Sequence, residues 1–179
     1  DKHVPFIHNV RTTDVATAVS DRATDCLGLL FNSDVGRQYL IERRTVPPAI
    51  VDALSSLGLS SICNIVAAIK TARYFDLGEE DVVLTVATDG AEMYSSEWEK
   101  VTRKHFGGRF DTVNAGEAFA QHLLGAATDH YLELSARDRA RIFNLGYYTW
   151  VEQQGVGIAE FNARRDPRFW TDLRRCLLA

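Results

Sequence analysis

The segment from Leu57 to Gly90, LGLSSICNIVAAIKTARYFDLGEEDVVLTVATDG, contains the two patterns from which the fold is predicted. Apolar residues recur at helical intervals from Ile62 to Ala72, as on one face of an α-helix. The run VVLTVA at 82–87 is apolar and rich in β-branched residues, which is typical of a strand covered on both faces of a parallel sheet. We therefore predict a helix over 60–75 and a buried strand over 82–87.

The order of the predicted elements before this segment is typical of an α/β fold. A short strand is predicted over 14–20, and helices are predicted over 22–32, 34–44 and 49–57. Strand, helices and strand in this order favour helices packed on a parallel sheet. The expected fold class is therefore α/β, with a mainly parallel sheet flanked by helices.

The sequence pattern changes after residue 96, and this change divides the chain into two expected parts. The later patterns predict only helices, over 98–105, 115–134, 135–144 and from Pro167 onward. We expect residues 1–96 to form the α/β domain. Residues 97–179 are expected to form a helical extension packed on that domain.

Composition and charge restrict the class of protein. The 179 residues are 46% hydrophobic and 25% charged, which is typical of a folded globular chain. The net charge of -4 argues against nucleic acid as a partner, because nucleic-acid-binding surfaces are usually basic. No leader pattern opens the sequence and no apolar run reaches about 18 residues, so a membrane is not an expected partner either.

Cysteines and histidines give no pattern of a metal site. Cys26, Cys63 and Cys176 are far apart and form no CxxC pair, which favours a reducing cytoplasm and small apolar roles for the three side chains. The five histidines form no HExxH or similar pattern, so no metal is expected. Five arginines between positions 164 and 175 are interpreted as a solvated helix face.

Two polar patterns at the ends of the quoted segment predict a ligand site. The turn Gly58-Leu59-Ser60-Ser61 places free backbone N–H groups and two hydroxyls at the start of the predicted helix, where an anionic group can bind. The residues TDG at 88–90 follow the predicted strand, at the edge where open α/β sheets bind ligands. Two simpler interpretations stay open: the serines cap an ordinary helix, and the polar turn is an ordinary loop.

The run GLSSICNIVAAIKTARYF, followed by DVVLTVATDGAEMYSS, resembles the C-terminal part of pyridoxal-phosphate enzymes of fold type II. This group is similar to the tryptophan synthase β-subunit and includes cysteine synthase and cystathionine β-synthase. In it, a segment like GISSGAN begins a long helix, a hydrophobic strand follows, and a polar turn ends in ERYLS. The matching residues here are Gly58, Ser60, Ser61, Asn64, Glu92, Tyr94 and Ser95. The opening segment, with Pro5, also resembles a family loop, so the resemblance covers about residues 1 to 96.

The resemblance implies a cofactor, an activity and a set of site residues. It implies pyridoxal 5'-phosphate and β-replacement or β-elimination on a small amino-acid substrate, with a homodimer as the expected assembly. The cofactor would lie against Thr88, Asp89 and Gly90, and Gly90 stands where the family usually has a serine or threonine. Either the Thr88 hydroxyl or the Asp89 carboxylate would then face the pyridine nitrogen. The implied rim of the active site consists of His3, Pro5, Gly58, Ser60 and Ser61.

The family's Schiff-base lysine and phosphate cradle belong to an N-terminal half that this sequence does not match. Because the sequence also opens at Asp1 without a methionine, we expect a fragment that needs the missing N-terminal half of the same enzyme. None of the four lysines is expected to form the Schiff base. Lys70, Lys100 and Lys104 are predicted on polar helix faces, and Lys2 lies near the chain start.

Two other functions remain open. The first is a non-catalytic α/β binding or regulatory module that keeps the fold and lacks the chemistry. The second is an unrelated nucleotide-binding α/β domain, against which the lack of a GxGxxG or GxxxxGK[ST] motif counts.

Overall fold

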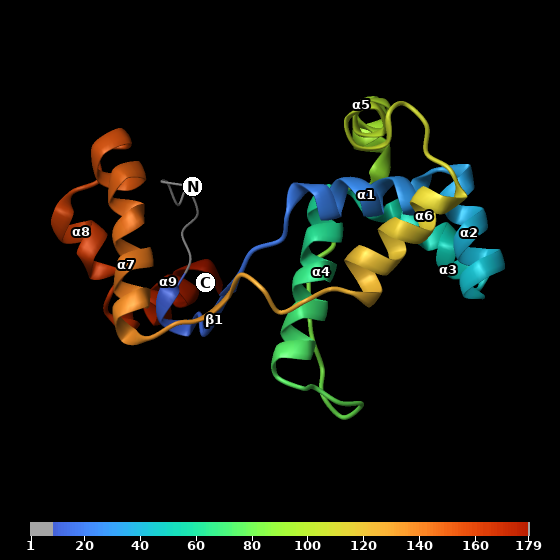
Figure 1. Cartoon of the computed structure of the whole chain (residues 1–179). Coiled ribbons are helices and arrows are strands. Elements are labelled where there is room, and N and C mark those ends of the chain that lie inside the picture. The colour runs from blue at the N-terminus through green and yellow to red at the C-terminus, as the bar shows by residue number, and fades with distance from the viewer. Residues whose placement is uncertain (1–8, 179) are drawn as a thin grey trace. The chain divides into compact units, whose positions relative to one another are not determined.

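The protein is mostly helical (Figure 1). The computed structural model describes residues 9–178, and 68% of it is helical. The described residues contain one sheet, formed by the antiparallel strands β1 (Val15–Thr17) and β2 (Tyr131–Glu133). The predicted α/β class, with a mainly parallel sheet flanked by helices, is therefore wrong. His3 and Pro5 lie outside the described residues.

The chain folds as two compact units. The core unit is Thr17–His130, and the terminal unit combines the described residues of Asp1–Ala16 with those of Tyr131–Ala179. The boundary expected between residues 96 and 97 falls inside the core unit. Sequence on both sides of that boundary contributes side chains to one hydrophobic core.

The core unit is a bundle of six α-helices with three short 3-10 or π-helical turns. Its elements are α1 (Asp21–Asn32), α2 (Asp34–Arg44), α3 (Pro48–Ala53), η2 (Leu54–Ser56), α4 (Leu59–Tyr74), η3 (Ala91–Tyr94), α5 (Ser95–Phe106), α6 (Thr112–Phe119) and η4 (Ala120–Leu124). The loops between the first three helices are short, so consecutive helices pack against each other.

Side chains at the helix starts explain why these segments are helical. The Ser20 hydroxyl accepts a hydrogen bond from the backbone of α1, and the Ser33 hydroxyl does the same for α2. Asp111 and Asn114 form a reciprocal capping box at the start of α6. Pro48 begins α3, where the missing proline N–H costs nothing. Local sequence therefore decides where these helices begin.

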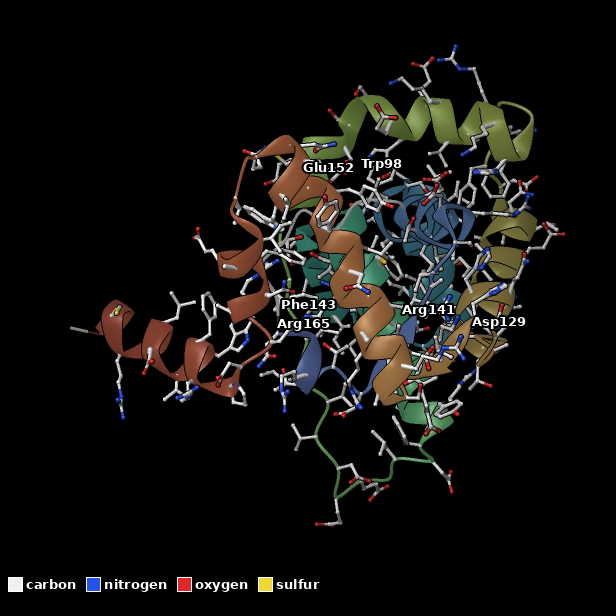
Figure 2. All side chains as sticks on the ribbon, turned by 90° about the vertical axis from the view of Figure 1, so that its left-hand side faces the viewer. Trp98, Asp129, Arg141, Phe143, Glu152 and Arg165 are labelled. Carbon is white, nitrogen blue, oxygen red and sulfur yellow. The ribbon has the colours of Figure 1, made fainter. Side chains whose placement is uncertain are left out.

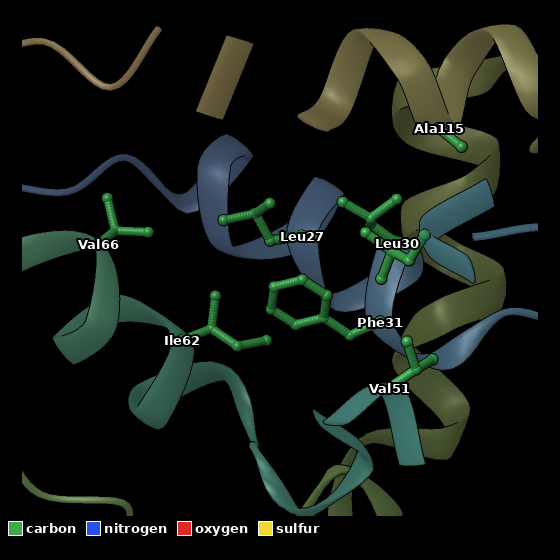
Figure 3. Close-up of a cluster of buried hydrophobic side chains, with 8 residues drawn as sticks. Leu27, Leu30, Phe31, Val51, Ile62, Val66 and Ala115 are labelled. Atoms are coloured by element: carbon green, nitrogen blue, oxygen red, sulfur yellow. The ribbon is translucent and has the colours of Figure 1, made fainter. Parts of the chain in front are cut away.

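The hydrophobic core forms around α1 (Figure 3). This helix packs against α2, α4, α5 and α6. Its central cluster consists of Leu27, Leu30, Phe31, Leu40, Val51, Ile62, Val66 and Ala115. The predicted helix over 60–75 is confirmed by α4, which places Ile62 and Val66 in this cluster as its apolar spacing requires.

The predicted strand over 82–87 is wrong. The segment is neither helix nor strand, and its side chains point largely into solvent, with Val82 90% and Leu84 93% exposed. A β-branched run forms a strand only where a neighbouring strand pairs with its backbone. Along the described residues no strand lies beside 82–87, and the Asn64 side chain donates one hydrogen bond to the Val86 oxygen.

The terminal unit is also mainly helical. It contains η1 (Val10–Thr12), β1 except for Thr17, β2, α7 (Ala136–Tyr147), η5 (Tyr148–Gln153), α8 (Ile158–Ala163) and α9 (Pro167–Leu178). The helices predicted over 135–144 and from Pro167 are confirmed. The helix predicted over 115–134 is wrong beyond residue 124, because the chain leaves the helix at Gly125 and then forms β2.

Candidate functional site

The first of the two predicted ligand segments forms the start of α4. Gly58 is its N-cap residue in an extended conformation, and no side chain caps the helix. The interpretation of Ser60 and Ser61 as ordinary helix caps is therefore wrong. The first intrahelical bond runs from the Ile62 N–H to the Gly58 oxygen. The backbone N–H groups of the first turn of α4 that precede Ile62 have no acceptor among the residues described and can bind an anion.

The second predicted segment lies directly against this helix start. The Thr88 N–H donates to the Ser61 hydroxyl at 2.8 Å, and the Gly58 N–H donates to the Asp89 oxygen at 2.6 Å. Ser61 is only 1% exposed, so its hydroxyl is committed to holding the turn. Residues separated by about thirty positions in the chain thus form one polar cluster, which we call the 58–90 cluster (Gly58, Ser60, Ser61, Thr88, Asp89 and Gly90).

The polar groups left over in the 58–90 cluster set what it can bind. The Tyr94 hydroxyl donates to Oδ2 of Asp89 at 2.8 Å, and this hydrogen bond raises the pKa of the Tyr94 phenol above its ordinary value. Thr88 and Asp89 are exposed, and no described lysine or arginine forms an ion pair with Asp89. Besides the N–H groups of the first turn, the cluster therefore presents the hydroxyls of Ser60 and Thr88 and the Asp89 carboxylate to a ligand.

A groove of about 500 Å³ opens beside the same helix start, between the first turns of α1 and α4 and the helix α5. Its two lysines already have acidic partners: Lys100 pairs with Glu97 at 2.6 Å and Lys104 with Asp25 at 3.2 Å. Cys63 also lines the groove, and burial raises the pKa of its thiol, which disfavours the nucleophilic thiolate. The groove therefore contains no activated nucleophile.

The expectation that Lys70 lies on a polar, water-exposed helix face is wrong. Lys70 is 5% exposed, and its Nζ donates to the Ala18 oxygen at 2.8 Å and to Oδ1 of Asp129 at 3.3 Å. The sequence does indicate this burial, because Lys70 follows Ile62 and Val66 at four-residue intervals and therefore lies on the same helix face. Its ammonium group is thus occupied by a carbonyl and a carboxylate.

Sequence reasoning missed His122, which lines a cavity of about 300 Å³ together with Lys70. His122 lies in the π-helical turn η4 and is 8% exposed, and its Nε2 has no described hydrogen-bond partner. Burial lowers the pKa of His122, and the charge of Arg22 lowers it further. No motif in the sequence marks this residue, because its burial depends on how α6 and η4 pack.

The position of Gly58 gives a direct test of the 58–90 cluster. A Cβ at this position would lie 2.6 Å from the Asp89 oxygen and 2.7 Å from the Tyr94 ring. We expect Gly58→Ala to displace the turn at 88–90 and to lower the free energy of unfolding by about 1–3 kcal/mol, because backbone atoms cannot move aside cheaply. Chemical denaturation and the NMR shift of the Thr88 amide measure the two effects.

Gly78→Ala is the matched control, because nothing lies within 4 Å of its added Cβ. We expect it to leave both the stability and the Thr88 amide shift close to those of the natural chain. Equal behaviour of the two variants would contradict the close contact between Gly58 and the turn.

Neither a metal site nor a single membrane-spanning helix is found in the described part of the chain. Residues 9–178 contain no group of three or more side chains placed to hold a metal ion. No helix among them is by itself long and apolar enough to cross a membrane. The adjoining segments Pro48–Ser56 and Leu59–Tyr74 meet that condition only as a pair, and they bend by 118° where they join.

Comparison with known proteins adds no family to these observations. The sequence matches no protein-family model, and no curated protein and no solved structure is significantly similar to the chain. A functional assignment therefore rests on the residues and contacts of this chain itself.

Proposed function

We propose that this chain is the C-terminal part of a pyridoxal-phosphate-dependent enzyme that catalyses β-replacement or β-elimination on a small amino acid. The observation that supports this function best is the contact between the two segments that carry the sequence resemblance. Ser61 binds the backbone of Thr88, and Gly58 binds the backbone of Asp89. In this proposal the 58–90 cluster forms one wall of the cofactor site.

The groups exposed on this wall are chemically suited to the pyridine ring. The Thr88 hydroxyl can donate a hydrogen bond to an unprotonated ring nitrogen, whereas the Asp89 carboxylate can accept one from a protonated nitrogen. Both choices stay open, and Tyr94 orients the carboxylate through its hydrogen bond. When bound, the cofactor supplies an electron sink for the carbanion formed at the substrate. Ser61 and Gly58 position the wall and do not touch the ring.

The rest of the enzyme would supply what this wall lacks. The segment 82–87 leads into the wall and exposes the apolar side chains of Val82, Leu84 and Val86, which is costly in water. We propose that the N-terminal half of the same enzyme covers this segment and contributes the catalytic lysine. A homodimer working in the cytoplasm is part of the same proposal.

The chain by itself is expected to form no Schiff base with pyridoxal phosphate. A Schiff base needs an unprotonated amine that can reach the cofactor. The Lys70 amine is buried and bonded to Ala18 and Asp129, and Lys100 and Lys104 are paired with acidic side chains. The purified chain is mixed with pyridoxal phosphate and reduced with borohydride, and the peptides are then mapped. One stoichiometric pyridoxyl-lysine would show that no other half is needed.

The proposal as a whole is tested on the complete enzyme. We expect the coding sequence before Asp1 to include a lysine-bearing segment, and co-expression of the two parts to yield a protein with bound cofactor. One of the two variants Thr88→Val and Asp89→Asn should then shift the cofactor absorbance, namely the one that changes the side chain facing the ring nitrogen. If neither variant shifts it, the 58–90 cluster is no cofactor wall. If the two parts bind no cofactor at all, a non-catalytic binding or regulatory module takes the place of this function.

A further inference from the structure

A cavity of about 310 Å³ in the terminal unit brings three arginines together. Arg11 comes from η1, Arg139 from α7, and Arg165 from the turn between α8 and α9. The other lining residues are apolar, among them Val10 and Phe143, and no carboxylate lines the cavity. Its size is at the lower end of the range for small-molecule sites.

Protein oxygen atoms accept hydrogen bonds from two of the guanidinium groups, those of Arg139 and Arg11. The Arg139 Nε donates to the Thr13 oxygen at 2.9 Å, and its Nη2 donates to Oδ1 of Asp14 at 3.0 Å. Arg11 donates from Nη1 to the Arg165 oxygen at 3.1 Å. Asp14 is exposed, and an exposed ion pair contributes little free energy, so an anion in the cavity can still compete for Arg139.

Arg165 is fixed by two asparagines and by an aromatic ring. Its Nε donates to Asn162 at 3.1 Å and its Nη2 donates to Asn144 at 2.7 Å. Its guanidinium carbon lies 3.9 Å from the centroid of the Phe143 ring, and Figure 2 shows these two side chains next to each other. Arg165 is exposed, as the sequence-based interpretation expected, but it lies in the turn between α8 and α9 and not on a helix face.

The three guanidinium groups keep most of their hydrogen-bonding capacity. A guanidinium has five N–H donors, and the described contacts use no more than two on any of the three arginines. Donors that are already oriented and still unused favour an anion, since little side-chain entropy is lost on binding. The nearby carboxylate of Asp166 pairs with Arg168 at 2.7 Å, and the charge of Arg11 also helps to lower the pKa of Asp166.

We propose that this cavity binds a small organic phosphate monoester. The phosphate oxygens accept hydrogen bonds from Arg11, Arg139 and Arg165, and the organic group lies against Val10 and Phe143. A phosphate offers three terminal oxygens to three guanidinium groups, whereas a carboxylate offers two oxygens in one plane. The apolar lining adds affinity for the organic group, which inorganic phosphate cannot use.

Titration calorimetry of the full chain with phenyl phosphate at low ionic strength tests the proposal. We expect one saturable site, with affinity about tenfold weaker in Arg11→Gln and in Arg139→Gln, because each loses a charge-assisted hydrogen bond. Arg139→Lys is expected to weaken binding as well, since lysine keeps the charge and loses the planar fork. Thermal unfolding of each variant confirms that the chain stays folded.

Arg137→Gln is the matched control, because Arg137 is exposed on the same helix, lies outside the cavity and carries the same charge. We expect it to keep the affinity of the natural chain. Equal loss in the Arg137 and Arg139 variants would overturn the site in favour of general charge attraction. If benzoate bound as tightly as phenyl phosphate, the proposed preference for a phosphate group over a carboxylate would be overturned. If inorganic phosphate bound as tightly as phenyl phosphate, the proposed contact of the organic group with the apolar lining would be overturned. An absence of saturable binding would overturn the whole proposal.

Discussion

Replacing Leu30 with alanine is expected to lower the free energy of unfolding by about 2–5 kcal/mol. Leu30 is completely buried in the cluster around α1, where it packs among side chains from several helices. Truncation removes apolar contacts and leaves a cavity that the surrounding helices can close only in part. A domain of ordinary stability, about 5–15 kcal/mol, would lose a large share of it. Denaturant unfolding followed by circular dichroism measures the change.

Leu124→Ala is the matched control for this prediction, because Leu124 is 56% exposed in the same unit. Its effect should stay within about 0.5 kcal/mol, as for most surface substitutions. Similar losses in the two variants would show that Leu30 is not in the centre of the core.

Gly36→Ala is expected to destabilise the protein by about 3 kcal/mol. In most helices this substitution is favourable, because alanine has the higher helix propensity. Here an added Cβ would overlap the backbone oxygen of Leu30 and lie 2.7 Å from its carbonyl carbon and Cα. Backbone atoms of α1 would have to shift, so the close contact between α1 and α2 would be lost. Thermal and denaturant unfolding together measure the loss.

Gly116→Ala provides the opposite expectation within the same unit. Gly116 lies in α6, and its nearest neighbour, the Tyr39 ring, is 3.6 Å from the added Cβ, which is an ordinary contact. We expect this variant to be unchanged or more stable by about 0.4–1 kcal/mol, since alanine lowers the entropy of the unfolded chain. A stabilising effect of Gly36→Ala of the same size would contradict the packing of α2 on α1.

Local patterns in the sequence predicted most of the helices. The spacing of Ile62 and Val66 placed α4 and the side of it that is buried. Serine before a helical pattern marked the start of α1, and proline marked the start of α3 and α9. These features act within one or two turns of the chain, so they can be recognised without knowledge of the rest of the fold.

Strands and buried charges could not be predicted in the same way. The run at 82–87 has the composition of a buried strand, but a strand also needs a partner for its backbone, and none is present among the described residues. Lys70 was expected in water because lysine usually is. Its burial depends on Ala18 and Asp129, which lie more than fifty positions away and accept its hydrogen bonds.

The sequence by itself determined most of the helical segments, the Ser20 cap of α1 and the two polar segments at 58–61 and 88–90, because these follow from neighbouring residues. Only the tertiary structure decided that the two polar segments meet through Ser61 and Thr88, and that Arg11, Arg139 and Arg165 line one cavity. Such contacts join residues that are far apart in the chain. Their energies depend on distance and burial in the folded molecule, which spacing along the sequence does not specify.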